Sequence, residues 1–477
     1  NTKRLFTLIT VLLIGVLLTS CSKTTENEHL PEYCRTYSGF MEFASEDLYN
    51  LVGGINRDNY LSVISSNEEV FYGYDSEGDI DLDGIQCFQN LTSLTLDGPG
   101  FKDISEINAL KNIQHISLIN TNVVNISSFK NLSKVNQLTI SNTKTLQSVD
   151  GIEEMTKLTY LDLSDNGIVN IDGLNNLINL DTLILSNNEI TFFPSINNLY
   201  KLETLDVSNN NIIQLGDDLS GLVNLVNFDA SNNQICDLST LDDLESLVTL
   251  NLGDNNLGCN GESPDFSALE SAANLTTLIL NNNGLTSISD LDGRDLPLEE
   301  LQLQENLISD ISPIRNFTEL KRLDAYDNHI INIDDLSGMI NLTRIDLSKN
   351  DIIDFSGLRT IPDLDVINLS SNQITFIPDI SDSWPSLREL NLHNNVITDT
   401  SGVEGHPNLR TLILSDNLLT ALSVISNLPI LSELVLYHEP DESELETYDP
   451  FSKANVISTL RNSYNNNPVL SIVTQGY

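Results

Sequence analysis

Carboxylates alternate with apolar residues in the segment "DIDLDG", from Asp79 to Gly84, whose three aspartates end at Asp83. Calcium loops place oxygen ligands at their first, third and fifth positions in this way, so the segment is a candidate Ca²⁺ site. The twelfth position, where such loops carry glutamate, is Asn90. The same segment also fits a capping half-repeat. The spacing of its apolar residues, Leu82, Ile85 and Phe88, recurs further along the chain. Both interpretations remain open.

Arrangements typical of catalytic sites are not found in the sequence. It contains no paired histidines at helical spacing, no G-x-S-x-G turn and no glycine-rich phosphate loop, and its six histidines are scattered. We therefore predict a protein that is not an enzyme and needs no cofactor.

The first 21 residues predict export and lipidation. Lys3 and Arg4 precede an apolar run, Leu5–Leu18, whose 14 residues are too few for a membrane-spanning helix of ~20 residues. The run ends in "LTSC", which resembles the lipobox of bacterial lipoproteins. The resemblance implies cleavage before Cys21, lipidation of its thiol and, because Ser22 follows, sorting to the outer membrane. An ordinary secretory signal or a buried thiol is the alternative.

Four further cysteines, an even number in a chain predicted to be exported, favour two disulfides. Cys34 and Cys87 flank the segment that precedes the regular part of the sequence. Cys236 and Cys259 lie in neighbouring sequence repeats, where adjacent strands stack about one strand spacing apart. We predict the bridges Cys34–Cys87 and Cys236–Cys259, with free buried thiols or a metal pair as alternatives.

The charge of the chain excludes one class of partner. With 23 Lys and Arg against 68 Asp and Glu, the net charge is −45. Nucleic acid binding needs a basic footprint that matches the phosphates. We therefore expect no nucleic acid partner.

An internal repeat runs through most of the sequence and must position any functional side chain. Its frame is LxxLxLxxNxI, as in "ELKRLDAYDNHIINI" from Glu319 to Ile333. Successive units start 22 or 23 residues apart, except for 28 residues between Leu247 and Leu275. The first-position residues of the sixteen units are Leu91, Ile113, Val135, Leu158, Leu180, Leu202, Leu225, Leu247, Leu275, Leu298, Leu320, Leu342, Leu364, Leu387, Leu409 and Leu431. Leucine-rich repeats have periods of about 20 to 29 residues, so the pattern predicts a solenoid of stacked units.

The 22-residue form of this repeat resembles the bacterial internalin-type subclass of leucine-rich repeat proteins. The resemblance implies an α/β repeat solenoid, a right-handed superhelix with a long concave parallel β-sheet and extended or 3-10 segments on its convex side. We divide the chain into a signal peptide with lipobox (1–21), a tether and N-terminal cap (22–81), the repeat array (82–438) and a C-terminal cap (439–477).

Asparagine occupies the ninth position of twelve units, where the chain must turn. A buried amide both donates and accepts hydrogen bonds, so we predict that these asparagines pair with backbone groups left open by the turn. In the first three units the same position holds Pro99, Thr121 and Thr143. The long unit after Leu247 carries about six extra residues within 259–274. We expect this segment to leave the coil and rejoin it outside the core, with a short helix that has Ser267 as its N-cap and Leu269 turned inward.

Side chains at positions two, three, five, seven and eight of each unit point away from the core onto the inner face. From Leu298 onward this face gathers basic and aromatic residues, which are frequent among binding hot spots. The candidate partner-binding residues are Arg322, Tyr326, Arg344, Lys349, Arg388 and His393. Cross-strand ion pairs, such as Glu300 with Arg322, are the alternative explanation of these residues.

The sequence thus favours a lipid-anchored protein of the bacterial envelope whose concave face binds another protein, in the way that internalin-like adhesins bind host receptors. The alternatives are an envelope scaffold without a specific ligand and a carbohydrate-binding protein. The second of these is disfavoured because few inner-face aromatics are available to stack on sugar rings.

Overall fold

The computed structural model describes residues 70–72, 79–80, 82, 85, 88, 91–216, 219–259, 261, 263–419, 427–436 and 471–473. Within them the chain forms one sheet of eighteen strands, and each strand pairs in parallel with the strand before it. The strands are β1 (Val70–Tyr72), β2 (Ser93–Asp97), β3 (His115–Ile119), β4 (Gln137–Ser141), β5 (Tyr160–Asp162), β6 (Thr182–Ile184), β7 (Thr204–Asp206), β8 (Asn227–Asp229), β9 (Thr249–Asn251), β10 (Thr277–Ile279), β11 (Glu300–Gln302), β12 (Arg322–Asp324), β13 (Arg344–Asp346), β14 (Val366–Asn368), β15 (Glu389–Asn391), β16 (Thr411–Ile413), β17 (Glu433–Val435) and β18 (Ser471–Val473).

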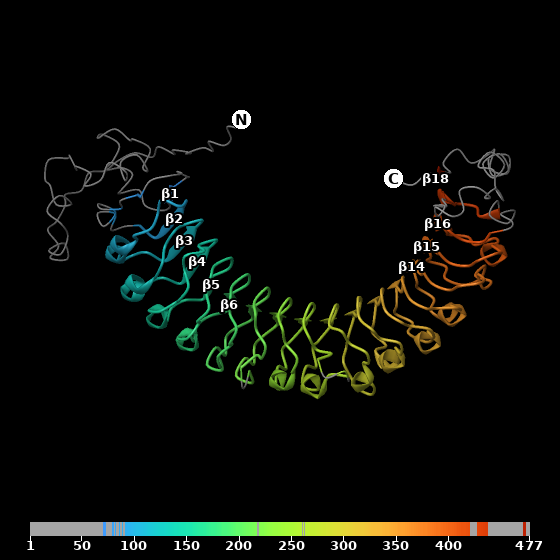
Figure 1. Ribbon diagram of the computed structural model, residues 1–477, viewed down its shortest axis with the longest axis horizontal. Coiled ribbons are helices and arrows are strands. Elements are labelled where there is room, and N and C mark those ends of the chain that lie inside the picture. The colour runs from blue at the N-terminus through green and yellow to red at the C-terminus, as the bar shows by residue number, and fades with distance from the viewer. Residues whose placement is uncertain are drawn as a thin grey trace, which may run out of the picture.

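The sheet lines the inner side of a broad arc, and the return segments lie along its outer side (Figure 1). The helical segments on the outer side are all short 3-10 helices. They are η4 (Ser105–Ala109), η5 (Ser127–Asn131), η6 (Ile152–Glu154), η7 (Leu174–Asn176), η8 (Ser239–Leu241), η9 (Ser267–Leu269), η10 (Ser289–Leu291), η11 (Ser312–Asn316), η12 (Asp334–Leu336), η13 (Ser356–Thr360) and η14 (Ser401–Val403). The predicted solenoid, with a concave parallel sheet and 3-10 segments outside, is confirmed.

One hydrophobic core runs through the whole array. In the unit that contains β12, the side chains of Leu320, Leu323, Ile333 and Leu336 are completely buried. A single unit has too few neighbours to cover these residues, so each unit depends on the next for its core. Within the described residues, no helix is both long and apolar enough to span a bilayer.

The ninth-position asparagines form a hydrogen-bonded ladder beneath the turn after each strand. Asn328 is typical: its Nδ2 donates to the carbonyls of Leu303 (3.0 Å) and Ala325 (3.2 Å), and its Oδ1 accepts from the amide of Ile308 (2.9 Å). The residue before each asparagine adopts a positive φ, as at Asp327 (φ 56°). This left-handed conformation suits the asparagine and aspartate that often occupy the position. The prediction that these asparagines satisfy backbone groups is confirmed.

Hydroxyl groups replace the amides at the N-terminal end of the ladder. The buried Oγ1 atoms of Thr121 and Thr143 lie 2.9 Å apart and share a hydrogen bond. The backbone amide of Thr143 then donates to Oδ1 of Asn166 (2.7 Å), the first asparagine of the ladder. The second and third units therefore continue the stack with a different polar side chain.

Two strands extend the sheet beyond the sixteen repeats. β1 pairs with β2, and β18 pairs with β17, both in parallel. Their sequences, "VFY" and "SIV", lack the letters of the repeat frame. The segments predicted as caps thus contribute a strand at each end of the sheet.

The long unit follows the expectation drawn from the sequence only in part: Leu269 is turned inward as expected, but the N-cap of the short helix is Phe266 and not Ser267. Phe266 and Leu269 are buried like the apolar residues of every other return segment, so the extra residues lie between Leu257 and Phe266. Ser267 is the first residue of η9, and its amide donates to Oδ1 of Asp265 (2.9 Å). The segment from Phe266 onward belongs to the core because it continues the stack, and only the loop before it is additional.

A disulfide joins this loop to the preceding unit. Cys236 and Cys259 are bonded, with their Cα atoms 5.9 Å apart. Cys21, Cys34 and Cys87 lie outside the described residues.

Candidate functional site

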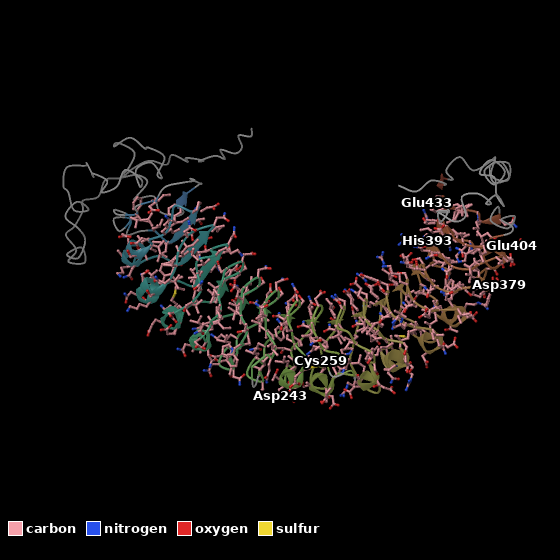
Figure 2. The ribbon with its side chains drawn as sticks, in the orientation of Figure 1. Asp243, Cys259, Asp379, His393, Glu404 and Glu433 are labelled. Atoms are coloured by element: carbon pink, nitrogen blue, oxygen red, sulfur yellow. A yellow bond between two sulfur atoms is a disulfide. The ribbon has the colours of Figure 1, made fainter. Side chains whose placement is uncertain are left out.

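The candidate site is the inner face of strands β11 to β16. Parallel pairing aligns equal positions of adjacent units, so Glu300, Arg322, Arg344, Val366 and Glu389 follow one another across the sheet. In Figure 2, His393 and Glu433 lie on the inner side of the arc, whereas Asp379 and Glu404 lie on its outer side. The sheet therefore brings the sequence-predicted binding residues onto one surface.

Lysine side chains of two neighbouring units pair with carboxylates of the preceding unit. Nζ of Lys321 lies 2.7 Å from Oε1 of Glu299, and Nζ of Lys349 lies 3.4 Å from Oδ2 of Asp327. These four side chains are about half exposed or more. Exposed ion pairs of this kind contribute little to stability.

Arg322 is held more firmly than the lysines. Its guanidinium donates to Oδ2 of Asp324 at 2.6 and 3.0 Å, and it also lies 3.5 Å from Oε1 of Glu300. Asp324 is buried, so its carboxylate has little access to water. The hydrogen bond to Asp324 raises the pKa of Arg322. The contact with Glu300 is the cross-strand pair considered from the sequence, whereas the closer contact with Asp324 lies within β12.

Arg388 forms a bidentate ion pair with Asp365, which is at the second position of the preceding unit. Hydrogen bonding to Arg388 lowers the pKa of Asp365. Arg344 and Arg410 differ from the other inner-face arginines, because neither forms an ion pair with any described residue. Arg344 is close enough to Asp365 to lower its pKa further by charge attraction alone.

Tyr326 and His393 also contact carboxylates. The hydroxyl of Tyr326 donates to Oε1 of Glu305 (3.1 Å), and burial, followed by this hydrogen bond, raises the pKa of the phenol. Nδ1 of His393 lies 3.4 Å from Oδ2 of Asp416. Five of the six predicted binding residues are thus already engaged by neighbours, and Arg344 is the exception.

The N-terminal part of the inner face has a different character. In the units that carry β2 to β10, none of the inner-face positions is Lys or Arg. Hydroxyl and amide side chains predominate there, together with carboxylates such as Asp162, Asp206 and Asp229. The Lys and Arg residues of the concave surface are therefore confined to its C-terminal part.

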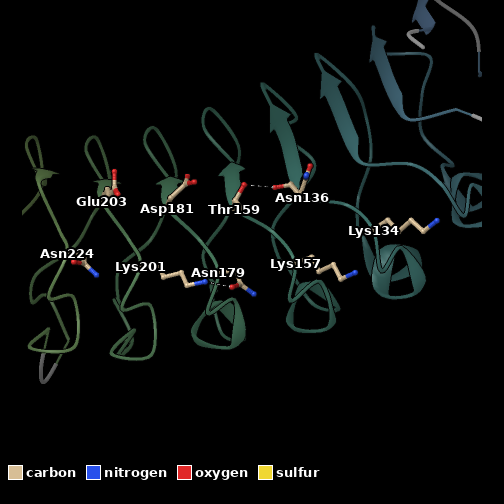
Figure 3. A pocket seen from close by; sticks show the side chains of 9 residues that line it. All are labelled: Lys134, Asn136, Lys157, Thr159, Asn179, Asp181, Lys201, Glu203 and Asn224. Atoms are coloured by element: carbon tan, nitrogen blue, oxygen red, sulfur yellow. Dashed lines mark hydrogen bonds between the residues drawn. The ribbon is translucent and has the colours of Figure 1, made fainter. Parts of the chain in front are cut away.

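A shallow polar groove of about 650 Å³ lies along one flank of the array and was not predicted from the sequence (Figure 3). Lys134, Lys157 and Lys201 form a row along it, each directly before the first leucine position of its unit. Nζ of Lys201 donates to Oδ1 of Asn179 (2.7 Å), the residue that precedes the previous unit. Only the recurrence of lysine at one repeat position could have indicated this groove.

His406 lies on the opposite side of the core from the concave face and is completely buried. Its Nδ1 accepts from the amides of Asn408 (3.3 Å) and Leu409 (3.1 Å), and its Nε2 lies 3.2 Å from the carbonyl of Ser383. Because Nδ1 accepts hydrogen bonds and Nε2 faces a carbonyl, the ring is neutral with its proton on Nε2. Burial lowers the pKa of His406.

No group of three His, Cys, Asp or Glu in the described part of the chain is arranged to hold a metal ion. Asp79 of the candidate calcium segment forms an ion pair with Lys102, and the other two aspartates lie outside the described residues. Leu82, Ile85 and Phe88 are buried in the core, as a capping half-repeat requires.

Comparisons with known proteins agree with this geometry. A family model for two copies of leucine-rich repeats matches residues 178–224 and 362–405, and a model for a single leucine-rich repeat matches residues 154–173. No curated protein sequence matches the chain.

Solved structures share the fold over most of the chain at low sequence identity. A leucine-rich repeat protein of Leptospira interrogans is 24% identical, with 82% of this chain and 91% of that chain covered and a TM-score of 0.64. The functional domain of InlJ from Listeria monocytogenes, which includes a cysteine ladder, is 20% identical, with 73% and 74% covered and a TM-score of 0.58. The Arabidopsis receptor kinase HAESA, in complex with the peptide hormone IDA and the co-receptor SERK1, is 22% identical, with 78% and 68% covered and a TM-score of 0.54. The repeat frame, the parallel sheet and these likenesses identify the fold of this protein as a leucine-rich repeat solenoid.

Proposed function

We propose that this protein is a non-enzymatic recognition protein that binds another protein on the inner face of strands β11 to β16. The observation that carries the proposal is the distribution of basic residues on the concave surface. On a chain with a net charge of −45, the inner-face Lys and Arg residues gather on these strands and on no earlier repeat.

The sheet supports recognition because it presents these side chains from a rigid surface. Each strand is fixed by its two neighbours, and the asparagine ladder fixes the turn that follows it. The ion pairs around Arg322 and Arg388 hold those guanidinium groups in place before any partner arrives. Less side-chain freedom is then lost on binding, which favours affinity.

The proposal includes a location. The lipobox-like sequence at Cys21 supports a lipid anchor in the bacterial envelope, at the outer membrane, with the repeat array as the exported part. The resemblance of the 22-residue repeat to that of internalin-like adhesins is the reason to include adhesion to a host or envelope partner in the proposal. HAESA, in complex with a peptide hormone, provides a precedent for recognition by a solenoid of this fold.

An envelope scaffold without a specific ligand is a second candidate. Most of the inner-face Lys and Arg side chains already form ion pairs within the array, and this observation favours a scaffold. Both candidates predict a stable solenoid, but only recognition predicts a partner that depends on the inner face.

Blocking the inner face tests the proposal. A polyethylene glycol chain attached at Ser370→Cys would cover the concave surface near β14, and the same chain attached at Asp335→Cys, an exposed residue of η12, is the matched control. Pull-downs from envelope and host-cell extracts with residues 22–477 should recover a saturable partner with the control and lose it with the inner-face conjugate. Equal recovery with both conjugates would contradict concave-face recognition.

A further inference from the structure

Two neighbouring strands carry the same residues but use them differently. β12 reads Arg-Leu-Asp and β13 reads Arg-Ile-Asp, and Arg322 is in register with Arg344. In β12 the arginine is bound to the aspartate two residues later. In β13 no ion pair forms between Arg344 and Asp346. The contrast follows from the residues around each aspartate.

Asp346 is already occupied by other donors. Its Oδ1 accepts from the amide (3.0 Å) and the hydroxyl (2.6 Å) of Ser348, and its Oδ2 accepts from Nδ2 of Asn368 in β14 (2.8 Å). Asp324 lacks these donors, because Tyr326 replaces the serine and Asp346 replaces the asparagine in the next strand. Arg322 therefore binds its own aspartate, whereas Arg344 does not.

The other carboxylate near Arg344 is also committed. Asp365 uses both of its oxygens to accept from the guanidinium of Arg388. Arg344 thus lies beside two carboxylates, Asp346 and Asp365, whose oxygens all accept hydrogen bonds from other donors. Its side chain is exposed on the inner face, with five N–H donors and no acceptor among the described residues.

The surroundings favour a carboxylate from outside. Arg322 and Arg344 face each other across adjacent strands, and like charges in that arrangement destabilise a sheet. An added carboxylate relieves this repulsion and can accept two parallel hydrogen bonds from one guanidinium. Val366, the residue in register on the other side, is half-buried and offers an apolar surface for the carbon chain of an acidic residue.

We propose that Arg344 is the anchor of the concave face and binds a carboxylate of the protein partner, from either an acidic side chain or a free carboxyl terminus. The inference rests on the proposed function and specifies the chemistry of its partner. Arg322 and Arg388 are positioning residues: they neutralise the carboxylates around the anchor and leave Arg344 as the available guanidinium between them. Recognition is thus assigned to an arginine that the fold leaves without a partner of its own.

Chemical modification tests whether Arg344 is available. The detergent-purified full chain is treated with phenylglyoxal, which modifies arginine side chains, and the modified sites are followed over time by mass spectrometry. Arg344 should be modified several times faster than Arg322, although both lie in equivalent places on adjacent strands. Equal rates for the two arginines would overturn the proposal.

Selection of binders tests the carboxylate directly. Random peptides are selected in parallel on the wild-type chain and on Arg344→Gln, and the wild-type pool should be richer in Asp, Glu or free carboxyl ends. A selected acidic peptide should bind Arg344→Gln at least about tenfold more weakly, and Arg359→Gln, on η13 of the outer side, as tightly as the wild type. Amidation of the peptide terminus separates the two sources of the carboxylate.

The outcomes distinguish this inference from the function on which it rests. In one outcome, the selected peptides lose binding when the inner face is blocked at Ser370 but are not enriched in acidic groups. This result would overturn the role of Arg344 and leave concave-face recognition intact. Peptides that bind equally well when that face is blocked would contradict both. The absence of any enriched pool on the wild-type chain would also overturn the carboxylate anchor.

Discussion

Replacement of one ladder asparagine, Asn328→Leu, should destabilise the array through a single backbone amide. The carbonyls that Asn328 serves have second donors: that of Leu303 also accepts from Asn306 (2.8 Å), and that of Ala325 also accepts from Asn350 (3.0 Å). The amide of Ile308 has only Oδ1 of Asn328. A buried donor left without a partner costs about 1–3 kcal/mol, and the weakened carbonyl bonds add to this. We expect a loss of about 2–4 kcal/mol in the free energy of unfolding.

Urea unfolding, together with hydrogen exchange at the Ile308 amide, measures this effect. Asn341→Leu is the matched control, because that exposed asparagine makes one hydrogen bond, to the carbonyl of Thr318 (2.8 Å), which water can replace. Its cost should stay below about 1 kcal/mol. If Asn328→Leu costs no more than the control, or leaves exchange at Ile308 unchanged, the ladder does not stabilise the turns as described.

Four other perturbations give defined results. Because burial lowers the pKa of His406 from its ordinary 6.5, the unfolded chain binds a proton that the folded chain excludes. Stability should fall as the pH drops below about 6.5 toward the lowered pKa, and urea titrations should lose this dependence in His406→Leu but keep it in His329→Gln. Cys236→Ser opens a disulfide with a sequence separation of 23 and should cost about 3 kcal/mol; a melting curve like that of the wild type would argue against the bridge. Cys21→Ser should move the protein from the membrane to the soluble fraction, and unchanged fractionation would reject lipidation. Leu278→Asp places a charge in the core, where the wild-type residue is fully buried, and should abolish cooperative melting.

The repeat frame was sufficient to predict β2 to β17 and the role of the asparagines, because both follow from the spacing of residues along one chain. β1 and β18 could not be predicted in this way. A strand at the end of a parallel stack needs only backbone groups that match those of its neighbour. "VFY" and "SIV" therefore join the sheet without the letters of the frame.

The candidate site shows a second limit of the sequence. The sequence placed Arg322 and Arg344 on one surface. Both occur as Arg-x-Asp, so the three residues alone do not show which arginine binds its own aspartate. The difference depends on Ser348 and Asn368, which compete for one aspartate from another position and another strand. Likewise, the length of the unit after Leu247 revealed extra residues, but their location depended on which apolar side chains entered the core.

Photocrosslinking in the cells that make the protein tests the central claim most directly. A photoreactive amino acid is placed at Val366, on the inner face of β14, and at Asp335, on the outer side of the same region. Concave-face recognition predicts a discrete adduct of higher mass from position 366 and none from position 335. Adducts from position 335 alone, equal adducts from both positions, or none from either would contradict it.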